Sequence, residues 1–359
     1  MSAALPQRLA RLIRQDVQGM HAYAVQPSAG LVKLDAMENP HRLPPAVQRE
    51  LGERLGAVAL NRYPGERIDT LRQALARHAG LPEGFALMLG NGSDELISML
   101  AMACDVPGAS ILAPVPGFVM YGMSAQLQGL KFIPVDLTPD FELDERAMLA
   151  AIEQHRPSIV YLAYPNNPTA NLWDDEVIER IVRAAPGLVV MDEAYQPFAS
   201  RSYADRIARH EHVLLMRTMS KFGLAGVRLG YLVGRAALIA EIDKVRPPYN
   251  VSVLNCEAAL FALEHAAVFE AQAAQIRGER AALLERLAAL PGVKAWRTDA
   301  NMVLVRVPDA DRAFQGMKAR GVLIKNVSRM HPLLADCLRL TVGTAEENAQ
   351  MLAALQASL

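Results

Sequence analysis

Seven short apolar segments alternate with longer helical patterns between about Asn39 and Arg246. The segments are rich in Val, Ile and Leu without regular polar interruption, which is typical of strands buried on both faces of a sheet. They are Ala86–Leu89, Ser110–Ala113, Lys131–Val135, Ser158–Leu162, Leu188–Met191, His212–Met216 and Val227–Val233. This alternation predicts an α/β domain with a mostly parallel central sheet sandwiched by helices. In such sheets, ligands bind beside the carboxyl ends of the strands.

Two helical patterns in this region, Asp144–His155 and Asp174–Ala184, begin at an aspartate. An aspartate at the start of a helix accepts hydrogen bonds from the free N–H groups of the first turn, so both residues are candidate caps.

The pattern changes at Val245–Asn250, "VRPPYN", where two adjacent prolines interrupt it. A helical region follows to about Leu290, and then shorter strands alternate with helices. The expected strands are Val293–Trp296, Met302–Val307, Val322–Ile324 and Leu338–Val342. We expect a large domain at 39–246 and a smaller α+β domain made of 247–359 with the N-terminal arm, 1–38.

The overall charge argues against several classes of partner. The formal net charge is −1 and no stretch is strongly basic, so neither nucleic acid nor an anionic membrane is an expected partner. No apolar run approaches the roughly 18 residues that a membrane helix needs. The three cysteines, Cys104, Cys256 and Cys337, are far apart with no CxxC pair, so we expect no disulfide framework, no metal site and a reducing compartment.

The N-terminus allows two interpretations. Its first 15 residues contain three arginines and no acidic residue, as a transit peptide can. The alternative, which we favour, is an amphipathic arm helix with Leu9, Leu12 and Ile13 on one face. We therefore expect a cytoplasmic protein.

A glycine-rich loop, "GNGSDE" (Gly90–Glu95), connects the first predicted strand to an apolar helix. Free N–H groups and the positive end of the helix dipole make such a junction a ready anion site. The loop is not a Walker motif, because no Gly-Lys-Ser/Thr follows. The structural alternative is that Ser93 or Asp94 simply caps the helix.

Polar residues also follow two later strands. Asn167 lies in "AYPNNPTA" (Ala163–Ala170), which is either only a turn or a turn that presents a side-chain amide. Asp192 ends a buried strand, with Tyr195 three residues on. A carboxylate there needs a donor or cation as partner. It is either a local cap or ion pair, or the partner of a buried protonated ring nitrogen.

Lys221 lies on the turn between the last two predicted strands of the large domain, beside Ser220, Gly223 and Gly226. Arg228 follows seven residues later, within the last predicted strand. Most lysines are solvated surface charges. A lysine that is partly desolvated near other cations loses affinity for its proton and becomes a nucleophilic amine, which a carbonyl cofactor captures as a Schiff base.

The chain contains three motifs in order: Asn-Asn-Pro-Thr, then Asp-x-x-Tyr, then Ser-Lys followed by Gly and Arg. Together they resemble the motifs of the fold-type I pyridoxal-phosphate aminotransferases. The resemblance covers nearly the whole chain. More narrowly, the chain is similar to the histidinol-phosphate aminotransferase family, within class II. The supporting segments are Leu34–Pro40, Asn61–Gly65, Gly90–Glu95, Tyr164–Thr169, Arg217–Tyr231, Arg246–Asn250 and Leu338–Thr344.

The resemblance implies a role for each residue of a pyridoxal 5'-phosphate site. Lys221 carries the cofactor as a Schiff base and moves the substrate proton, and Asp192 keeps the pyridine nitrogen protonated. Tyr195 and Asn167 bind the ring's 3' oxygen, and Phe118 stacks on the ring. The phosphate is held by the backbone near Ser93 and Asp94, by Ser220 and Arg228, and by Tyr63 of a second subunit, which implies a homodimer.

The same resemblance implies the substrates, which are L-histidinol phosphate with 2-oxoglutarate, or imidazole-acetol phosphate with L-glutamate. Arg339 would grip the anionic end of the substrate, helped by Tyr23 and Tyr249. Lys325 stands where many relatives place an arginine. A lysine offers a cation for phosphate but not a bidentate fork, which leaves the substrate preference less defined.

Three alternatives remain at this point. Aromatic amino-acid aminotransferases and threonine-phosphate decarboxylases share the fold and the cofactor. A non-catalytic regulator on the same fold would carry a DNA-binding region, for which this chain has no room. A nicotinamide-dependent dehydrogenase is disfavoured, because no GxGxxG follows an early strand.

Overall fold

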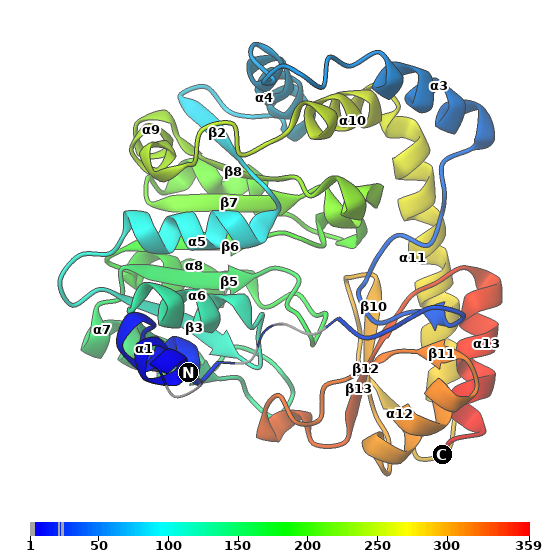
Figure 1. Ribbon diagram of the computed structural model, residues 1–359. Helices are drawn as coiled ribbons and strands as arrows, with labels where there is room; N and C mark the ends of the chain where they lie inside the picture. Colours follow the sequence, from blue (N-terminus) through cyan, green and yellow to red (C-terminus); the bar gives the residue numbers. More distant parts are fainter. Residues whose placement is uncertain (1–3, 21, 23–24) are drawn as a thin grey trace.

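A seven-stranded sheet forms the centre of the larger part of the protein in the computed structural model, which describes residues 4–20, 22 and 25–359 (Figure 1). The strand order is β2-β8-β7-β6-β5-β3-β4. These strands are β2 (Phe85–Gly90), β3 (Ser110–Val115), β4 (Lys131–Asp136), β5 (Ile159–Ala163), β6 (Leu188–Asp192), β7 (Val213–Thr218) and β8 (Gly230–Arg235). Strand β8 runs antiparallel to both of its neighbours, β2 and β7, and every other pair of neighbouring strands in this sheet is parallel. The predicted mostly parallel sheet is confirmed.

Both faces of the sheet are buried, because successive side chains of each strand enter different cores. In β5, Val160 and Leu162 pack into one apolar cluster, whereas Ile159 and Tyr161 pack into the other. Four helices cover the first face: α4 (Arg67–Ala79), α7 (Glu145–His155), α8 (Asp175–Ala184) and α10 (Val253–Glu264). Three helices cover the second: α5 (Ser93–Ala103), α6 (Met120–Gln128) and α9 (Ala236–Ile242). This double coverage explains why the strands lack polar alternation.

Two helices of this part, α7 and α8, begin and end close to the expected residues. The helices of this part are α3 (Pro45–Gly56), α4 (Arg67–Ala79), α5 (Ser93–Ala103), α6 (Met120–Gln128), α7 (Glu145–His155), α8 (Asp175–Ala184), α9 (Ala236–Ile242) and α10 (Val253–Glu264). Both predicted caps are confirmed: the carboxylate of Asp144 accepts from the N–H of Ala147 at 2.9 Å, and that of Asp174 from Val177 at 3.0 Å.

A smaller α+β region lies beside the large sheet (Figure 1). Its antiparallel sheet has the order β12-β13-β10-β9, and β1 pairs with β11 in parallel. Its elements are β1 (Val32–Lys33), α11 (Ala266–Ala288), β9 (Lys294–Ala295), β10 (Met302–Arg306), α12 (Ala310–Ala319), β11 (Val322–Leu323), β12 (Lys325–Asn326), β13 (Cys337–Thr341) and α13 (Ala345–Gln356). Strand β12 was not predicted.

The helical region after "VRPPYN" consists of two helices, α10 and α11, which meet at His265. Buried residues of α10, including Cys256 and Leu260, belong to the core of the large sheet. The predicted boundary at residue 246, between a large domain (39–246) and a smaller one, stays a prediction.

The N-terminal arm contains α1 (Ala4–Leu12) and α2 (Gln15–Gln18). Arg14 between them donates to the backbone oxygens of Gln126 and Leu127 at the end of α6. Leu9 and Leu12 are 45% and 73% exposed, so the apolar side of α1 faces solvent in a single chain. Among the described residues, no helix is both long and apolar enough to cross a membrane.

Candidate active site

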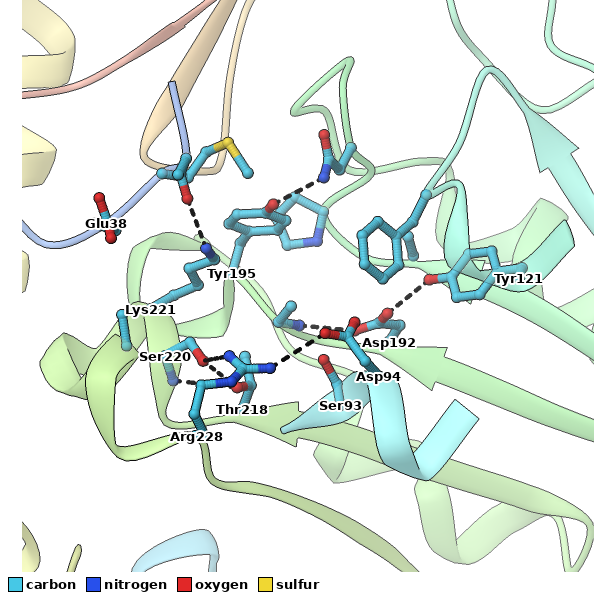
Figure 2. Close-up of a pocket in the computed structure, with 18 of the residues that line it drawn as sticks. Glu38, Ser93, Asp94, Tyr121, Asp192, Tyr195, Thr218, Ser220, Lys221 and Arg228 are labelled. Atoms are coloured by element: carbon cyan, nitrogen blue, oxygen red, sulfur yellow. Dashed lines mark hydrogen bonds and ion pairs between the residues drawn. The ribbon is translucent and has the colours of Figure 1, made fainter. Parts of the chain in front are cut away.

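A cavity of about 350 Å³ opens at the carboxyl ends of β5, β6 and β7, as expected for a largely parallel sheet. Nine of the predicted site residues line it: Ser93, Asp94, Phe118, Asn167, Asp192, Tyr195, Ser220, Lys221 and Arg228. Figure 2 shows that those of them that it labels come from several elements and point toward one space.

Lys221 lies on one tight turn, Ser220–Leu224, that follows β7. Its Nζ donates a hydrogen bond, at 2.9 Å, to the backbone oxygen of Ala36 in the segment that follows β1 (Figure 2). Burial, and then the nearby cation of Arg339, lower the pKa of Lys221 to about 8, although Glu38 opposes the shift. Lys221 is therefore not a solvated surface charge, and its amine loses a proton more readily than an ordinary lysine.

This shift predicts how Lys221 reacts with a small amine-selective reagent, measured at Lys221 by peptide mass spectrometry. The rate constant should rise about tenfold per pH unit below pH 8 and level off above it, because only the neutral amine reacts. Arg339→Gln should move the levelling point upward, since it removes a cation that favours the neutral amine. A wild-type rate that keeps rising toward pH 10.5, the ordinary lysine value, would contradict the shift.

Asp192 is the last residue of β6 and is only 4% exposed. Its Oδ2 accepts from the hydroxyl of Tyr121 at 2.6 Å, and its Oδ1 accepts from the N–H of Ala194 at 3.1 Å. Burial raises the pKa of Asp192 to about 6, and these two hydrogen bonds oppose the rise. The local bond to Ala194 matches the capping alternative. A buried carboxylate in a cavity wall also suits a cationic ligand.

Asn167 connects two other predicted residues. Its Nδ2 donates to the hydroxyl oxygen of Tyr195 at 3.0 Å, while its Oδ1 accepts from Nη1 of Arg339 at 2.8 Å. Arg339 also donates through Nη2 to the backbone oxygen of Asp35 at 2.7 Å. The arginine therefore fixes which end of the Asn167 amide faces Tyr195. The turn and the amide donor predicted for Asn167 are both present.

The start of α5, with Ser220 and Arg228, has groups that suit an anion, and we refer to these residues as the anion cradle. The N-cap residue of α5 is Gly92, and no side chain caps the helix, so the alternative that Ser93 or Asp94 caps it is wrong. Arg228 lies opposite: its guanidinium donates to the Ser220 hydroxyl at 3.4 Å and to the Asp94 carboxylate at 3.2 Å (Figure 2). Free helix N–H groups, a hydroxyl and a guanidinium together suit a phosphate group.

The prediction that Arg228 lies on a strand is wrong. Strand β8 begins only at Gly230, and Arg228 has a φ of 54°. The glycine-containing turn continues through a short 3₁₀ segment, Ala225–Val227, and the left-handed Arg228 then redirects the chain into β8. This conformation places the guanidinium beside the start of α5.

Gly92 is required by this cradle. It has φ 83° and ψ 169°, a region open essentially to glycine, and a Cβ there would lie 2.5 Å from Nη2 of Arg228. Gly92→Ala should lower the free energy of unfolding by about 1–3 kcal/mol and weaken phosphate binding, measured by denaturant unfolding and calorimetry. Gly108→Ala is the control, because it has φ 80° but nothing within 4 Å of its Cβ. Equal phosphate affinity in the two variants would refute the role of Gly92.

Four predicted residues among those that the structure describes do not line this cavity: Tyr63, Tyr249, Lys325 and Arg339. Tyr63 and Tyr249 stack on each other, with ring centroids 4.2 Å apart, and are 74% and 55% exposed. Lys325 is half-buried on β12, directly opposite Arg339 on β13. Tyr23 lies outside the described residues.

Three polar side chains that line the cavity were not predicted: Glu38, Tyr121 and Thr218. Thr218 accepts from the N–H of Ser220 at 3.1 Å and so orders that hydroxyl-bearing residue. Tyr121 follows Phe118 by three residues, a spacing that places two aromatic side chains on neighbouring positions of a helical turn. That spacing was the available signal for Tyr121.

Comparisons with known proteins agree with this geometry. The chain matches the family "Aminotransferase class I and II" over residues 29–355. It is 74% identical to a histidinol-phosphate aminotransferase of Polaromonas naphthalenivorans over 99% of both chains. A histidinol-phosphate aminotransferase of Methylibium petroleiphilum is also 74% identical, over 99% of this chain and 96% of its own.

A solved structure shares the fold. The histidinol-phosphate aminotransferase of Sinorhizobium meliloti, in complex with pyridoxal-5'-phosphate, superposes with a TM-score of 0.83. The two sequences are 24% identical, and the match covers 96% of each chain.

Proposed function

The chain belongs to the class I and II aminotransferases, and we propose that it transfers the amino group of L-histidinol phosphate to 2-oxoglutarate in histidine biosynthesis. The products are imidazole-acetol phosphate and L-glutamate. One observation carries the reaction type: Lys221, with a lowered pKa, shares a cavity with the buried carboxylate of Asp192 and an anion cradle. The two relatives that are 74% identical over nearly their full length support the substrate.

The residues of the cavity fit pyridoxal 5'-phosphate, which has an aldehyde, a pyridine nitrogen and a phosphate. Lys221 suits the aldehyde, Asp192 suits a protonated ring nitrogen, and the start of α5 with Arg228 suits the phosphate. When bound, this cofactor supplies a carbon that takes up amino groups and a ring that accepts the electron pair left when a Cα–H bond breaks.

The chain's own groups then have distinct tasks. The N–H groups of Ser93 and Asp94, with Ser220 and Arg228, hold the phosphate. The carboxylate of Asp192 keeps a proton on the ring nitrogen. Lys221 is the amine that would bind the aldehyde carbon. Its neutral Nζ would also move the proton from the substrate Cα to the carbon of the cofactor that had carried the aldehyde oxygen.

Three further residues orient the ring. We propose that Tyr195 and Asn167 bind its 3' oxygen, since the Asn167 amide is already directed at the tyrosine hydroxyl. Phe118 lines the cavity and is placed to cover a ring face. Together they hold the reacting bond in one orientation and exclude water from it.

We propose that Arg339 binds the anionic end of the substrate and that Lys325, Tyr249 and Tyr23 contribute to the same binding site. Arg339 is 8% exposed, and its contact with Asn167 places it at the edge of the cavity. Lys325 is its cross-strand neighbour. The same cationic site would take the phosphate of histidinol phosphate and the carboxylate of glutamate in turn.

A homodimer completes the proposal, with Tyr63 reaching the cofactor phosphate of the partner subunit. Tyr63 and Tyr249 stack on each other, are largely exposed and do not line the cavity of their own chain, which supports a role in another copy. Light scattering on the purified protein should give the mass of two chains, and a monomer at micromolar concentration would refute this assignment.

We also propose a cytoplasmic location. None of the three cysteines forms a disulfide, which suits a reducing compartment.

The test of the reaction is glutamate formation from 2-oxoglutarate with three amino donors: L-histidinol phosphate, L-phenylalanine and O-phospho-L-threonine. We expect kcat/KM to be highest for L-histidinol phosphate. A higher value for phenylalanine would indicate an aromatic aminotransferase. Release of CO₂ from phosphothreonine without glutamate formation would indicate a decarboxylase.

A further inference from the structure

Tyr121 on α6 contacts the carboxylate of Asp192, a residue 71 positions later in the chain. Its hydroxyl donates to Oδ2 at 2.6 Å, and the two side chains are 2% and 4% exposed. Figure 2 shows this hydroxyl pointing at Asp192 from the wall of the cavity. Hydrogen bonds to a charged acceptor are among the stronger ones in a protein.

The ring of Tyr121 is held on two sides. It stacks on Tyr161 of β5, with centroids 4.3 Å apart and planes 7° apart. It also packs edge-on against Phe118 at 5.6 Å. These contacts fix the direction of the hydroxyl, so the hydrogen bond costs little side-chain entropy when the site is used.

The protonation of this pair has a clear direction. Burial, and then the charge of Asp192, raise the pKa of Tyr121 well above its usual value, so its hydroxyl stays protonated and donates. The charged and titratable groups that face the pair are Asp94 of α5, Glu193 next to Asp192, Tyr195 and Tyr161. The carboxylates among them, Asp94 and Glu193, raise the pKa of Asp192, as burial does. The hydrogen bond from Tyr121 lowers that pKa and so opposes both effects.

We propose that Tyr121 is a positioning residue for the amino transfer: its O–H fixes the orientation of the Asp192 carboxylate and keeps it ionised. The inference rests on the proposed function, because Asp192 acts there on the cofactor's ring nitrogen. Each Asp192 oxygen accepts one hydrogen bond from the protein, which leaves lone pairs free for a ring N–H. Tyr121 itself does not touch the reacting atoms.

The test compares Tyr121→Phe with a matched control, Tyr161→Phe. Both substitutions remove a hydroxyl from the same aromatic stack, and the Tyr161 hydroxyl has no hydrogen-bond partner among the described residues. The probe is 4'-deoxypyridoxine 5'-phosphate, which keeps the ring nitrogen and phosphate but lacks the aldehyde that would react with Lys221. Its Kd is measured on the full-length apo protein from pH 6 to pH 8.

The expected result is a loss of affinity that depends on pH. Without its donor, Asp192 should titrate about one pKa unit higher, so Tyr121→Phe should raise Kd about fivefold at pH 6 and hardly at all at pH 8. Tyr161→Phe should match wild type at each pH. In an Asp192→Asn background, Tyr121→Phe should produce no pH-dependent change, because no carboxylate remains to titrate.

A Tyr121→Phe effect of the same size at every pH would overturn the inference, since packing alone would produce it. An equal pH-dependent effect of Tyr161→Phe would overturn it as well. If Tyr121→Phe does not fold, Tyr121→Leu carries the same test. Failure of wild type to bind the probe would instead refute the proposed function, on which the inference rests.

Discussion

Lys221→Ala is expected to lower kcat for amino transfer by on the order of 10⁴-fold, because it removes both the amine that binds the cofactor and the group that moves the substrate proton. The phosphate cradle is untouched, so pyridoxal 5'-phosphate should still bind, without a covalent link. Steady-state glutamate formation, and mass spectrometry after borohydride reduction, measure the two effects.

Loss of folding can be separated from loss of chemistry in this variant. The lowered pKa of Lys221 means that its charged form is disfavoured in the folded state, so alanine should leave the melting temperature of the apo protein unchanged or raise it. Lys244→Ala, which replaces an exposed lysine paired with Glu241, is the control and should keep full activity. If kcat of Lys221→Ala were reduced by less than tenfold relative to wild type, the role assigned to Lys221 would be contradicted.

Asp192→Asn is expected to lower kcat by about 10²–10³-fold, because the variant keeps the shape of the side chain but loses the charge opposite the ring nitrogen. Phosphate contacts should keep the cofactor bound, so the effect should appear in kcat more than in occupancy. Activity of the cofactor-saturated variant within tenfold of wild type would refute the pairing of Asp192 with the ring.

The same substitution predicts a pH dependence of stability in the apo protein. The folded pKa of Asp192, about 6, lies above its ordinary value of 3.8. The unfolded chain therefore releases this proton first, and the contribution of Asp192 to stability is present at low pH and lost as pH rises from about 4 to 6. Relative to Asp192→Asn, the wild-type protein should lose about 3 kcal/mol of unfolding free energy across that window. Denaturant unfolding at pH 4, 5, 6 and 7 measures it, and a constant difference would contradict the shift.

The parts of the fold predicted correctly are those with local signals. The apolar runs of β5 and β6 predict buried strands, and Asp144 and Asp174 predict the starts of α7 and α8. The break between α10 and α11 carries neither proline nor glycine at His265, so local rules predicted one helical region. Arg228 was misplaced because its left-handed backbone depends on the turn around it.

The site depends on contacts that local rules do not contain. Arg339 reaches Asn167 across 172 residues, and Tyr121 reaches Asp192 across 71. Base rates alone favour a solvated Lys221, and its shifted pKa arises from burial and from Arg339, a residue of another sheet. The family resemblance brought Arg339 into the predicted set, whereas the signal for Tyr121, its spacing from Phe118, was not used.

The most direct test of the central claim is the visible absorbance of the protein loaded with pyridoxal 5'-phosphate, followed while L-histidinol phosphate is added without 2-oxoglutarate. We predict that the yellow absorbance is lost in a single turnover and that about one imidazole-acetol phosphate forms per chain. Absorbance that is unchanged by L-histidinol phosphate but lost with phenylalanine would keep the cofactor and contradict the substrate. A protein that never becomes yellow with pyridoxal 5'-phosphate would contradict the role of Lys221 itself.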